Sequence, residues 1–214
     1  AKGIPHSIQG LSDGCEFLLM FDDGRQSEFT TSLLSDMIRS MPEHVIETSL
    51  GVPLKDLSKL PKHEMYIFES EVPGLLEKDR VESAAGRVPN WYSHNLANAP
   101  AIECQSGTMR EVTSKDFPAM DTMSIEEVTI EPGAMRTLHW HPEDEWQYYL
   151  QGSARVTVFM PQGGSSATFD FRAGDVGYIP GIAAHYVENT GSEPLKFLGV
   201  FRASELENVN FAEW

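Results

Sequence analysis

Basic residues are scarce in this chain of 214 residues, which carries 16 lysines and arginines against 32 aspartates and glutamates, for a formal net charge of -16. A nucleic-acid-binding surface needs a basic stripe, so this balance argues against DNA or RNA as a partner. The acidity also provides no long-range attraction for an anionic substrate. Such a substrate must therefore be held locally, by a metal ion or an arginine.

Cysteine is also nearly absent, because only Cys15 and Cys104 occur, far apart in the sequence, and they form no disulfide framework. No apolar run approaches the length of a membrane span, so we expect no membrane insertion. The compartment stays open between a secreted and a cytoplasmic soluble protein. The hydrophobic share of 41% can bury one sizeable core, or one core plus an appendage.

The chemistry of the chain is concentrated in residues 133–152. His139 and His141 are two residues apart, and the Thr, Leu and Trp residues around them favour a strand, in which positions i and i+2 point to the same face. Both imidazoles are therefore expected to face one cavity. Pro142 fits a turn, after which Glu145 begins a second strand, predicted to lie antiparallel to the first.

A fourth candidate ligand is His185. A Gly-Asp turn precedes a short strand, a Pro-Gly turn closes that strand, and His185 opens the next one. Three imidazoles and one carboxylate, with no thiolate, describe a site for a first-row divalent metal that can keep positions open for substrate. Manganese, iron, cobalt, nickel and zinc all accept such ligands, so the ligand types leave the metal open.

These residues match two motifs of the cupin family. The first motif fits at Gly133, His139, His141, Glu145 and Gly152. The second fits at Gly174, Pro180, His185 and Asn189, with Ile182 in place of its usual glycine two residues after the proline. The resemblance implies a mostly β fold, a cupin barrel of the double-stranded β-helix or jelly-roll type.

A weaker repeat relates residues 5–21 to residues 184–201. Each segment has a histidine, a β-like run, a polar turn and a Phe-Leu-x-x-Phe strand. Gly3 and His6 also fit the end of the second cupin motif, so the closing strands of a cupin occur twice and the His-x-His half once. This pattern predicts the C-terminal part of a two-cupin protein whose first barrel has lost its front part here, with His6 as an orphaned metal ligand.

The predicted organisation has four parts. Residues 1–22 are the closing strands of the truncated first cupin, and residues 23–61 are a lid loop with a small helical appendage. Residues 62–100 are an extended connection, and residues 101–214 are a complete second cupin barrel.

The appendage is expected to contain short helices. Thr31 or Ser32 can cap the first helix, residues 42–50 form the second, closed by Gly51, and residues 53–60 form the third. Family members exchange such helices between neighbours, so the resemblance implies a homo-oligomer, either a trimer or a pair of trimers. A complementing N-terminal cupin fragment is the other expected partner. The helices can equally well pack against the barrel of their own chain.

The motifs are most similar to those of bicupin oxalate decarboxylases, as in Pro-His-Ser-Ile-Gln, His-Trp-His-Pro and Glu-Trp-Gln-Tyr-Tyr. The resemblance implies that His139, His141, Glu145 and His185 bind manganese. It also implies that the substrate is oxalate, cleaved to formate and carbon dioxide with dioxygen as co-catalyst.

Two more residues receive roles from the resemblance. Arg136 lies at the position that contacts the substrate carboxylate, although it can equally be read as a surface or structural arginine. Its odd spacing from His139 puts it on the opposite face of a regular strand, unless the strand bends. Glu28, in Ser27-Glu-Phe-Thr, falls at the place of a flexible lid glutamate that serves as proton donor.

One position departs from the family pattern and keeps two other functions open. The glutamate that many relatives carry near the second-barrel metal falls at Gly199. Without a proton donor, oxidation of oxalate to carbon dioxide and peroxide competes, which would make the protein an oxalate oxidase. A non-catalytic manganese-binding or storage cupin is the other alternative, which metal uptake without turnover would identify.

Overall fold

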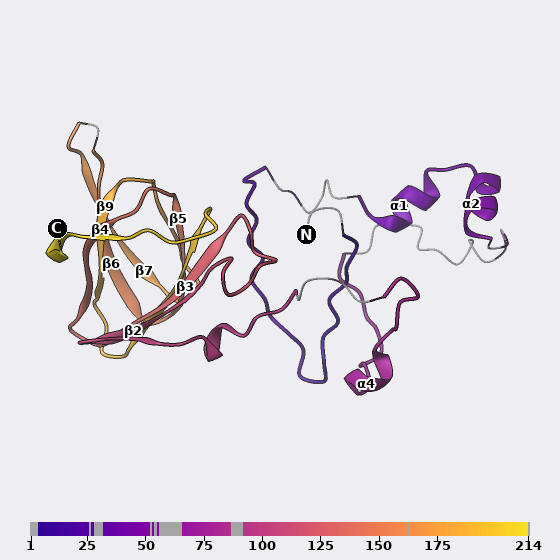
Figure 1. Ribbon diagram of the computed structural model, residues 1–214, viewed down its shortest axis with the longest axis horizontal. Helices are drawn as coiled ribbons and strands as arrows, with labels where there is room; N and C mark the ends of the chain where they lie inside the picture. The colour runs from indigo at the N-terminus through magenta and orange to yellow at the C-terminus, as the bar shows by residue number, and fades with distance from the viewer. Residues whose placement is uncertain are drawn as a thin grey trace. The chain divides into compact units, whose positions relative to one another are not determined.

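The computed structural model describes residues 4–25, 27, 32–51, 53, 55, 66–86, 92–161 and 163–213. The chain divides into two compact units, residues 2–84 and residues 85–214. The strands belong to the second unit, and helices α1, α2 and α4 belong to the first (Figure 1). None of the helices in the described ranges combines the length and hydrophobicity that a membrane crossing needs.

The first unit contains α1 (Leu34–Arg39), α2 (Glu43–Leu50) and α4 (Leu76–Asp79). As predicted, α2 ends at Gly51, which adopts a left-handed φ of 65° and donates its N–H to the Glu47 carbonyl. The N-cap of α1 is Leu33, so the predicted cap at Ser32 is wrong, and Thr31 lies outside the described residues. Most of the predicted third helix also lies outside them.

Residues 4–25 form no strand, although the sequence predicts closing strands there. Apolar side chains in this segment stay exposed, among them Phe17, Leu18 and Phe21. A strand needs neighbouring strands for its backbone N–H and C=O groups, and this segment has none beside it. Its origin as the end of a preceding cupin stays a prediction.

The second unit is built from two antiparallel sheets. The six-stranded sheet has the order β1-β2-β3-β10-β5-β8, and the five-stranded sheet has the order β11-β4-β9-β6-β7. The strands of the first are β1 (Ile102–Cys104), β2 (Gly107–Val112), β3 (Ser124–Ile130), β10 (Leu195–Phe201), β5 (Glu145–Gln151) and β8 (Val176–Ile179). Those of the second are β11 (Val209–Asn210), β4 (Met135–Trp140), β9 (Ala184–Asn189), β6 (Ser153–Phe159) and β7 (Ser166–Arg172).

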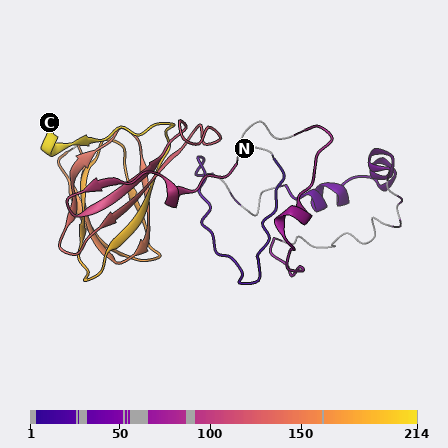
Figure 2. The ribbon, with the colours of Figure 1, turned by 60° about the horizontal axis from the view of Figure 1, so that its bottom comes forward.

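The two sheets curl around one interior, as Figures 1 and 2 show from two directions. Two turns of 3-10 helix, η2 (Leu96–Asn98) and η3 (Phe211–Glu213), lie before β1 and after β11. The mostly β barrel predicted for residues 101–214 therefore forms.

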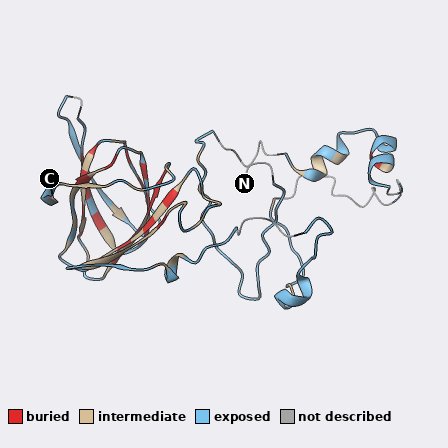
Figure 3. Ribbon diagram, in the orientation of Figure 1, coloured by how far each residue is buried: buried red, intermediate tan, exposed pale blue. Residues whose placement is uncertain are grey.

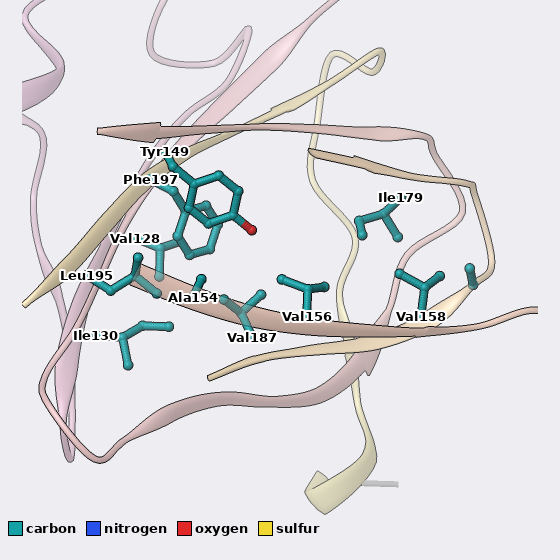
Figure 4. Close-up of a cluster of buried hydrophobic side chains, with 11 residues drawn as sticks. Val128, Ile130, Tyr149, Ala154, Val156, Val158, Ile179, Val187, Leu195 and Phe197 are labelled. Atoms are coloured by element: carbon teal, nitrogen blue, oxygen red, sulfur yellow. The ribbon is translucent and has the colours of Figure 1, made fainter. Parts of the chain in front are cut away.

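Burial alternates along β3 of one sheet and β9 of the other, so that one face of each sheet contributes to the core (Figure 3). On β3, Val128 and Ile130 are buried while Thr129 between them is only partly covered. The buried apolar side chains of both sheets form one cluster (Figure 4), which comprises Val128, Ile130, Tyr149, Ala154, Val156, Val158, Ile179, Ala183, Val187, Leu195 and Phe197. This cluster is the main source of stability, because burial of an aliphatic or aromatic side chain contributes about 1.5–3 kcal/mol.

Strands β4 and β5 do not pair with each other, and the predicted antiparallel pairing across Pro142 is wrong. Strand β4 pairs with β9 and β11, whereas β5 pairs with β10 and β8 in the other sheet. The connection at residues 141–144 thus crosses from one sheet to the other. Side chains on β4 and β5 can still meet, because the inner faces of both sheets line the same interior.

The turn between β8 and β9 packs against this crossing connection. Gly181 donates its N–H to Asp144 Oδ1 at 2.8 Å, and Ile182 donates its N–H to the His141 carbonyl at 2.8 Å. A Cβ at Gly181 would overlap the Pro142 carbonyl oxygen, so only glycine allows this approach. The contact fixes the backbone of His141 relative to β9.

Ile182, at the position where the motif usually has glycine, adopts a left-handed φ of 62°. A β-branched residue is rare in this region because its Cβ crowds the backbone, at a cost of roughly 1–2 kcal/mol. The side chain is 58% exposed, so little packing offsets this cost.

Replacing Ile182 with glycine should raise the free energy of unfolding by about 0.5–1 kcal/mol, since relief of the strain exceeds the added flexibility of the unfolded chain. Urea denaturation would measure the change. Gly133→Ala is the matched control, because Gly133 has a φ of 76° with nothing within 4 Å of an added Cβ, and it should lose about 1 kcal/mol. A destabilised Ile182→Gly variant would contradict the assignment of strain.

Candidate metal centre

Three buried imidazoles converge inside the barrel. The ligand atoms of His139, His141 and His185 all lie within 4.8 Å of one another. His139 is on β4, His141 directly follows that strand, and His185 is on β9. The structure therefore brings together the three histidines that the spacing predicts. A metal ion needs several histidine, cysteine, aspartate or glutamate side chains close together. In the part of the chain that the structure describes, this is the only group of three or more such side chains that lie close enough to hold one.

Each imidazole is oriented by a backbone carbonyl within two residues of it. The Nδ1 atoms lie 2.7 Å from the Thr137 carbonyl for His139, 2.6 Å from the Glu143 carbonyl for His141 and 3.0 Å from the Ala183 carbonyl for His185. A carbonyl only accepts, so each Nδ1 carries the proton and each Nε2 is left to bind a further group. The same second hydrogen bond orients most histidine ligands of protein-bound metals.

Glu145 approaches these imidazoles from the other sheet. Its Oε2 lies 3.1 Å from Nε2 of His141 and 3.2 Å from Nε2 of His185. The Nε2 of His185 is buried and makes no hydrogen bond of good geometry, despite the short distance. Gln147 donates to Oε1 of Glu145 at 3.0 Å, and the Tyr149 hydroxyl donates to Gln147 at 2.7 Å. This chain of hydrogen bonds along β5 fixes the carboxylate.

Electrostatics favour a charged Glu145 carboxylate and a neutral His139 imidazole. Burial opposes ionisation of Glu145, but the imidazoles of His141 and His185 close to its Oε2 outweigh burial and hold its pKa below the usual range. Burial lowers the pKa of His139 to about 3, helped by His185 and Arg136. Burial also acts to lower the pKa of His141, yet the hydrogen bond and charge of Glu145 raise it overall.

Arg136 faces the same interior as His139, contrary to its odd spacing on a regular strand. It is paired with Val187, and His139 is paired with His185, so β4 has one residue more than β9 between these two pairs. This is a β-bulge, and opposed residues share a face, so Arg136 and His139 both point inward with the fully buried Val187 and His185. The Arg136 guanidinium donates to Asn210 Oδ1 at 2.7 Å.

Glu126 is a buried carboxyl that the sequence analysis missed. It lies on the inner face of β3, is 3% exposed, and its Oε2 finds no hydrogen-bond partner among the described residues. Burial, followed by the charge of Glu145, raises its pKa to about 8, although Arg136 acts in the opposite direction. Counting back in steps of two from Val128, which belongs to the buried core, would have placed Glu126 inside.

The sequence also predicts His6 and Glu28 as site residues. His6 is exposed, and its Nδ1 lies 3.0 Å from the Ile4 carbonyl, outside the group of three imidazoles. Glu28 lies outside the described residues. Their predicted roles therefore stay predictions.

The donor set fits a divalent metal ion. Three Nε2 atoms with fixed tautomers and an adjacent carboxylate oxygen are ligands that manganese, iron, cobalt, nickel or zinc accept. The Phe201 ring stands edge-on to the His141 ring, with 5.0 Å between their centroids, and closes the site with an apolar wall. Such a wall limits access of water to whatever binds there.

A family profile described as Cupin matches residues 93–213, which is more than half of the chain. The protein therefore belongs to the cupin family, in agreement with its two-sheet barrel and inward-facing histidines.

Its individual relatives include oxalate decarboxylases. The chain is 46% identical over 214 residues to oxalate decarboxylase OxdC of Bacillus subtilis, covering 100% of this chain and 55% of that protein. A structure reported for the Mn(II) centres of Bacillus subtilis oxalate decarboxylase superposes with a TM-score of 0.86 at 44% identity, over 90% of this chain and 51% of that one. The formate complex of Lactobacillus farciminis oxalate decarboxylase gives a TM-score of 0.85 at 39% identity, over 89% and 56%.

These identities confirm the resemblance to oxalate decarboxylases that the motifs indicate. The chain spans about half the length of these relatives.

Substituting Tyr149 with phenylalanine should lower the free energy of unfolding by about 1–2 kcal/mol, because the buried Gln147 oxygen loses its donor. Burial raises the pKa of Tyr149, so the hydroxyl keeps its proton as a donor. Tyr148→Phe, on the opposite face of β5, is the control and should change stability by less than about 0.5 kcal/mol. Equal effects of the two variants in urea denaturation would show that the hydrogen bond from Tyr149 to Gln147 does not contribute to stability.

Proposed function

We propose that the protein is a manganese-dependent oxalate decarboxylase, which converts oxalate and a proton to formate and carbon dioxide. The ligands would be His139, His141, His185 and Glu145, and Arg136 would bind the substrate. When bound, manganese would supply a Lewis acid for the oxalate oxygens and, with dioxygen, one-electron redox chemistry.

The observation that carries this proposal is the bulge in β4, which turns Arg136 to the interior that also holds the three imidazoles. A cation beside a metal site is what a small dianion needs in a protein of net charge -16. The 46% identity to an oxalate decarboxylase supports oxalate as that dianion. The formate complex of a second relative supports formate as the product.

The residues of this chain would divide the work as follows. Arg136 orients one carboxylate of oxalate, with Asn210 holding its guanidinium in place. Glu145 balances the charge of the metal, and Gln147 fixes its orientation. Phe201 shields the site from water. When the C–C bond of oxalate breaks, one carbon leaves as carbon dioxide and the other takes up a proton, which a group at the site must deliver.

Several predictions from the sequence belong to the same proposal. Glu28 would be the lid proton donor, and His6 a metal ligand, of the preceding cupin. Assembly as a trimer or a pair of trimers would involve the helices of the first unit. These roles are supported by the resemblance to the family.

His141→Ala should reduce bound manganese by at least tenfold and abolish formate production, because an imidazole and the hydrogen-bond partner of Glu145 are both lost. Metal analysis and formate assays under air at mildly acid pH would measure the two effects. His44→Ala, an exposed histidine on α2, should match the wild type in both.

The wild-type control also separates the alternatives. Bound manganese without formate would identify a binding or storage cupin and overturn the decarboxylase proposal. Peroxide as the main product would identify an oxalate oxidase instead.

Arg136→Lys should raise the KM for oxalate by about tenfold or more with a smaller change in kcat, because lysine keeps the charge but loses the two-pronged contact with a carboxylate. Arg110→Lys is the matched control, since Arg110 pairs with Glu127 at 3.0 Å on the outer face of β2. An unchanged KM in Arg136→Lys would remove Arg136 from the substrate site.

A further inference from the structure

The proton that formate needs must come from a group beside the metal centre, and Gly199 has no side chain to provide it. Gly199 lies on β10, next to the inner face of β3 and β5. A Cβ added at Gly199 would lie 3.1 Å from Oε1 of Glu145, so this position borders directly on the candidate metal ligands.

The space in front of Gly199 is filled by Glu126. The two residues are directly opposed in the antiparallel pair of β3 and β10. A Cβ at Gly199 would lie 2.9 Å from Cγ and 3.1 Å from Oε1 of Glu126. The glycine therefore leaves room for a carboxyl group from the neighbouring strand, and the two positions cannot both carry a large side chain.

Glu126 differs from the glutamate beside it in how its carboxyl is satisfied. Glu127 points out of the barrel and lies 3.0 Å from Arg110 and 3.6 Å from Lys196. Glu126 points inward, and its buried Oε2 lacks a hydrogen-bond partner among the residues that the structure describes. A buried polar atom without a partner destabilises the folded protein by roughly 1–3 kcal/mol. A glutamate with only a structural role here could therefore be replaced by an apolar residue with little loss of stability. This orphaned oxygen is available to a bound molecule.

We infer that Glu126 is a catalytic residue of this centre, the acid that gives its proton to the carbon of the substrate after carbon dioxide has left. This inference rests on the proposed decarboxylase function. The C–C bond of oxalate breaks, its electron pair remains in net terms on the carbon that is kept, and the Glu126 proton forms the C–H bond of formate. Glu126 is left as a carboxylate and regains a proton from solvent.

The test compares three variants of the protein loaded with manganese. Glu126→Gln keeps the shape but carries no acidic proton, so formate production should fall by about 100-fold or more while manganese content and melting temperature stay at wild-type values. The share of oxalate that is oxidised to carbon dioxide with release of peroxide should rise. Glu127→Gln is the matched control and should keep wild-type formate production.

The third variant moves the carboxyl to the opposed strand. Glu126→Ala alone should lose formate production. The double variant Glu126→Ala/Gly199→Glu should produce formate about tenfold faster than Glu126→Ala, because the second substitution puts a carboxyl in the space that the first one empties.

Formate production within threefold of wild type in manganese-loaded Glu126→Gln would overturn the inference, whatever the double variant does. Loss of manganese from Glu126→Gln would also overturn it, since Glu126 would then act on the metal site itself. Absence of formate from the loaded wild type would instead refute the proposed function, and this inference with it.

Discussion

Everything in the interior of this barrel depends on keeping a set of buried polar side chains satisfied beside an apolar core. The inner face of β3 shows the transition, because Ile130 and Val128 belong to the apolar cluster whereas Glu126 and Ser124 continue the same face as polar residues. Burial of an unpaired polar group costs roughly 1–3 kcal/mol, so the polar part must be organised by hydrogen bonds or by a bound ligand. Backbone carbonyls orient the imidazoles, and Gln147 orients Glu145. Nε2 of His185 and Oε2 of Glu126 are buried atoms of this interior that have no hydrogen-bond partner among the described residues.

The site also depends on two places where regular backbone is interrupted. The bulge in β4 brings Arg136 and His139 to one face in spite of their odd spacing. The turn at Gly181 and Ile182 hydrogen-bonds to the connection that carries His141. Both irregularities occur next to candidate site residues, which a regular strand could not present together. The left-handed backbone at Ile182 costs stability, and the rest of the turn keeps it in this conformation.

Much of the fold and the core of the site follow from the sequence, because strand periodicity and motif spacing are local properties. The convergence of His139, His141 and His185 could be predicted in this way, and so could the barrel around them. The predicted pairing of β4 with β5 was wrong, because a turn motif does not show whether the chain returns in the same sheet or crosses to the other sheet. The bulge leaves no trace in residue types, and Glu126 was overlooked because two adjacent glutamates look alike until one face is known to be buried.

The separation of the candidate ligands between the two sheets has a mechanical consequence. His139 and His185 belong to the five-stranded sheet, and Glu145 belongs to the six-stranded sheet. An ion bound to all of these residues would be a cross-link between the two sheets. Opening of the barrel would then require the ion to leave at least one layer, so bound metal should oppose separation of the sheets. In such a protein, binding of the metal ion would also stabilise the folded barrel against separation of its two sheets.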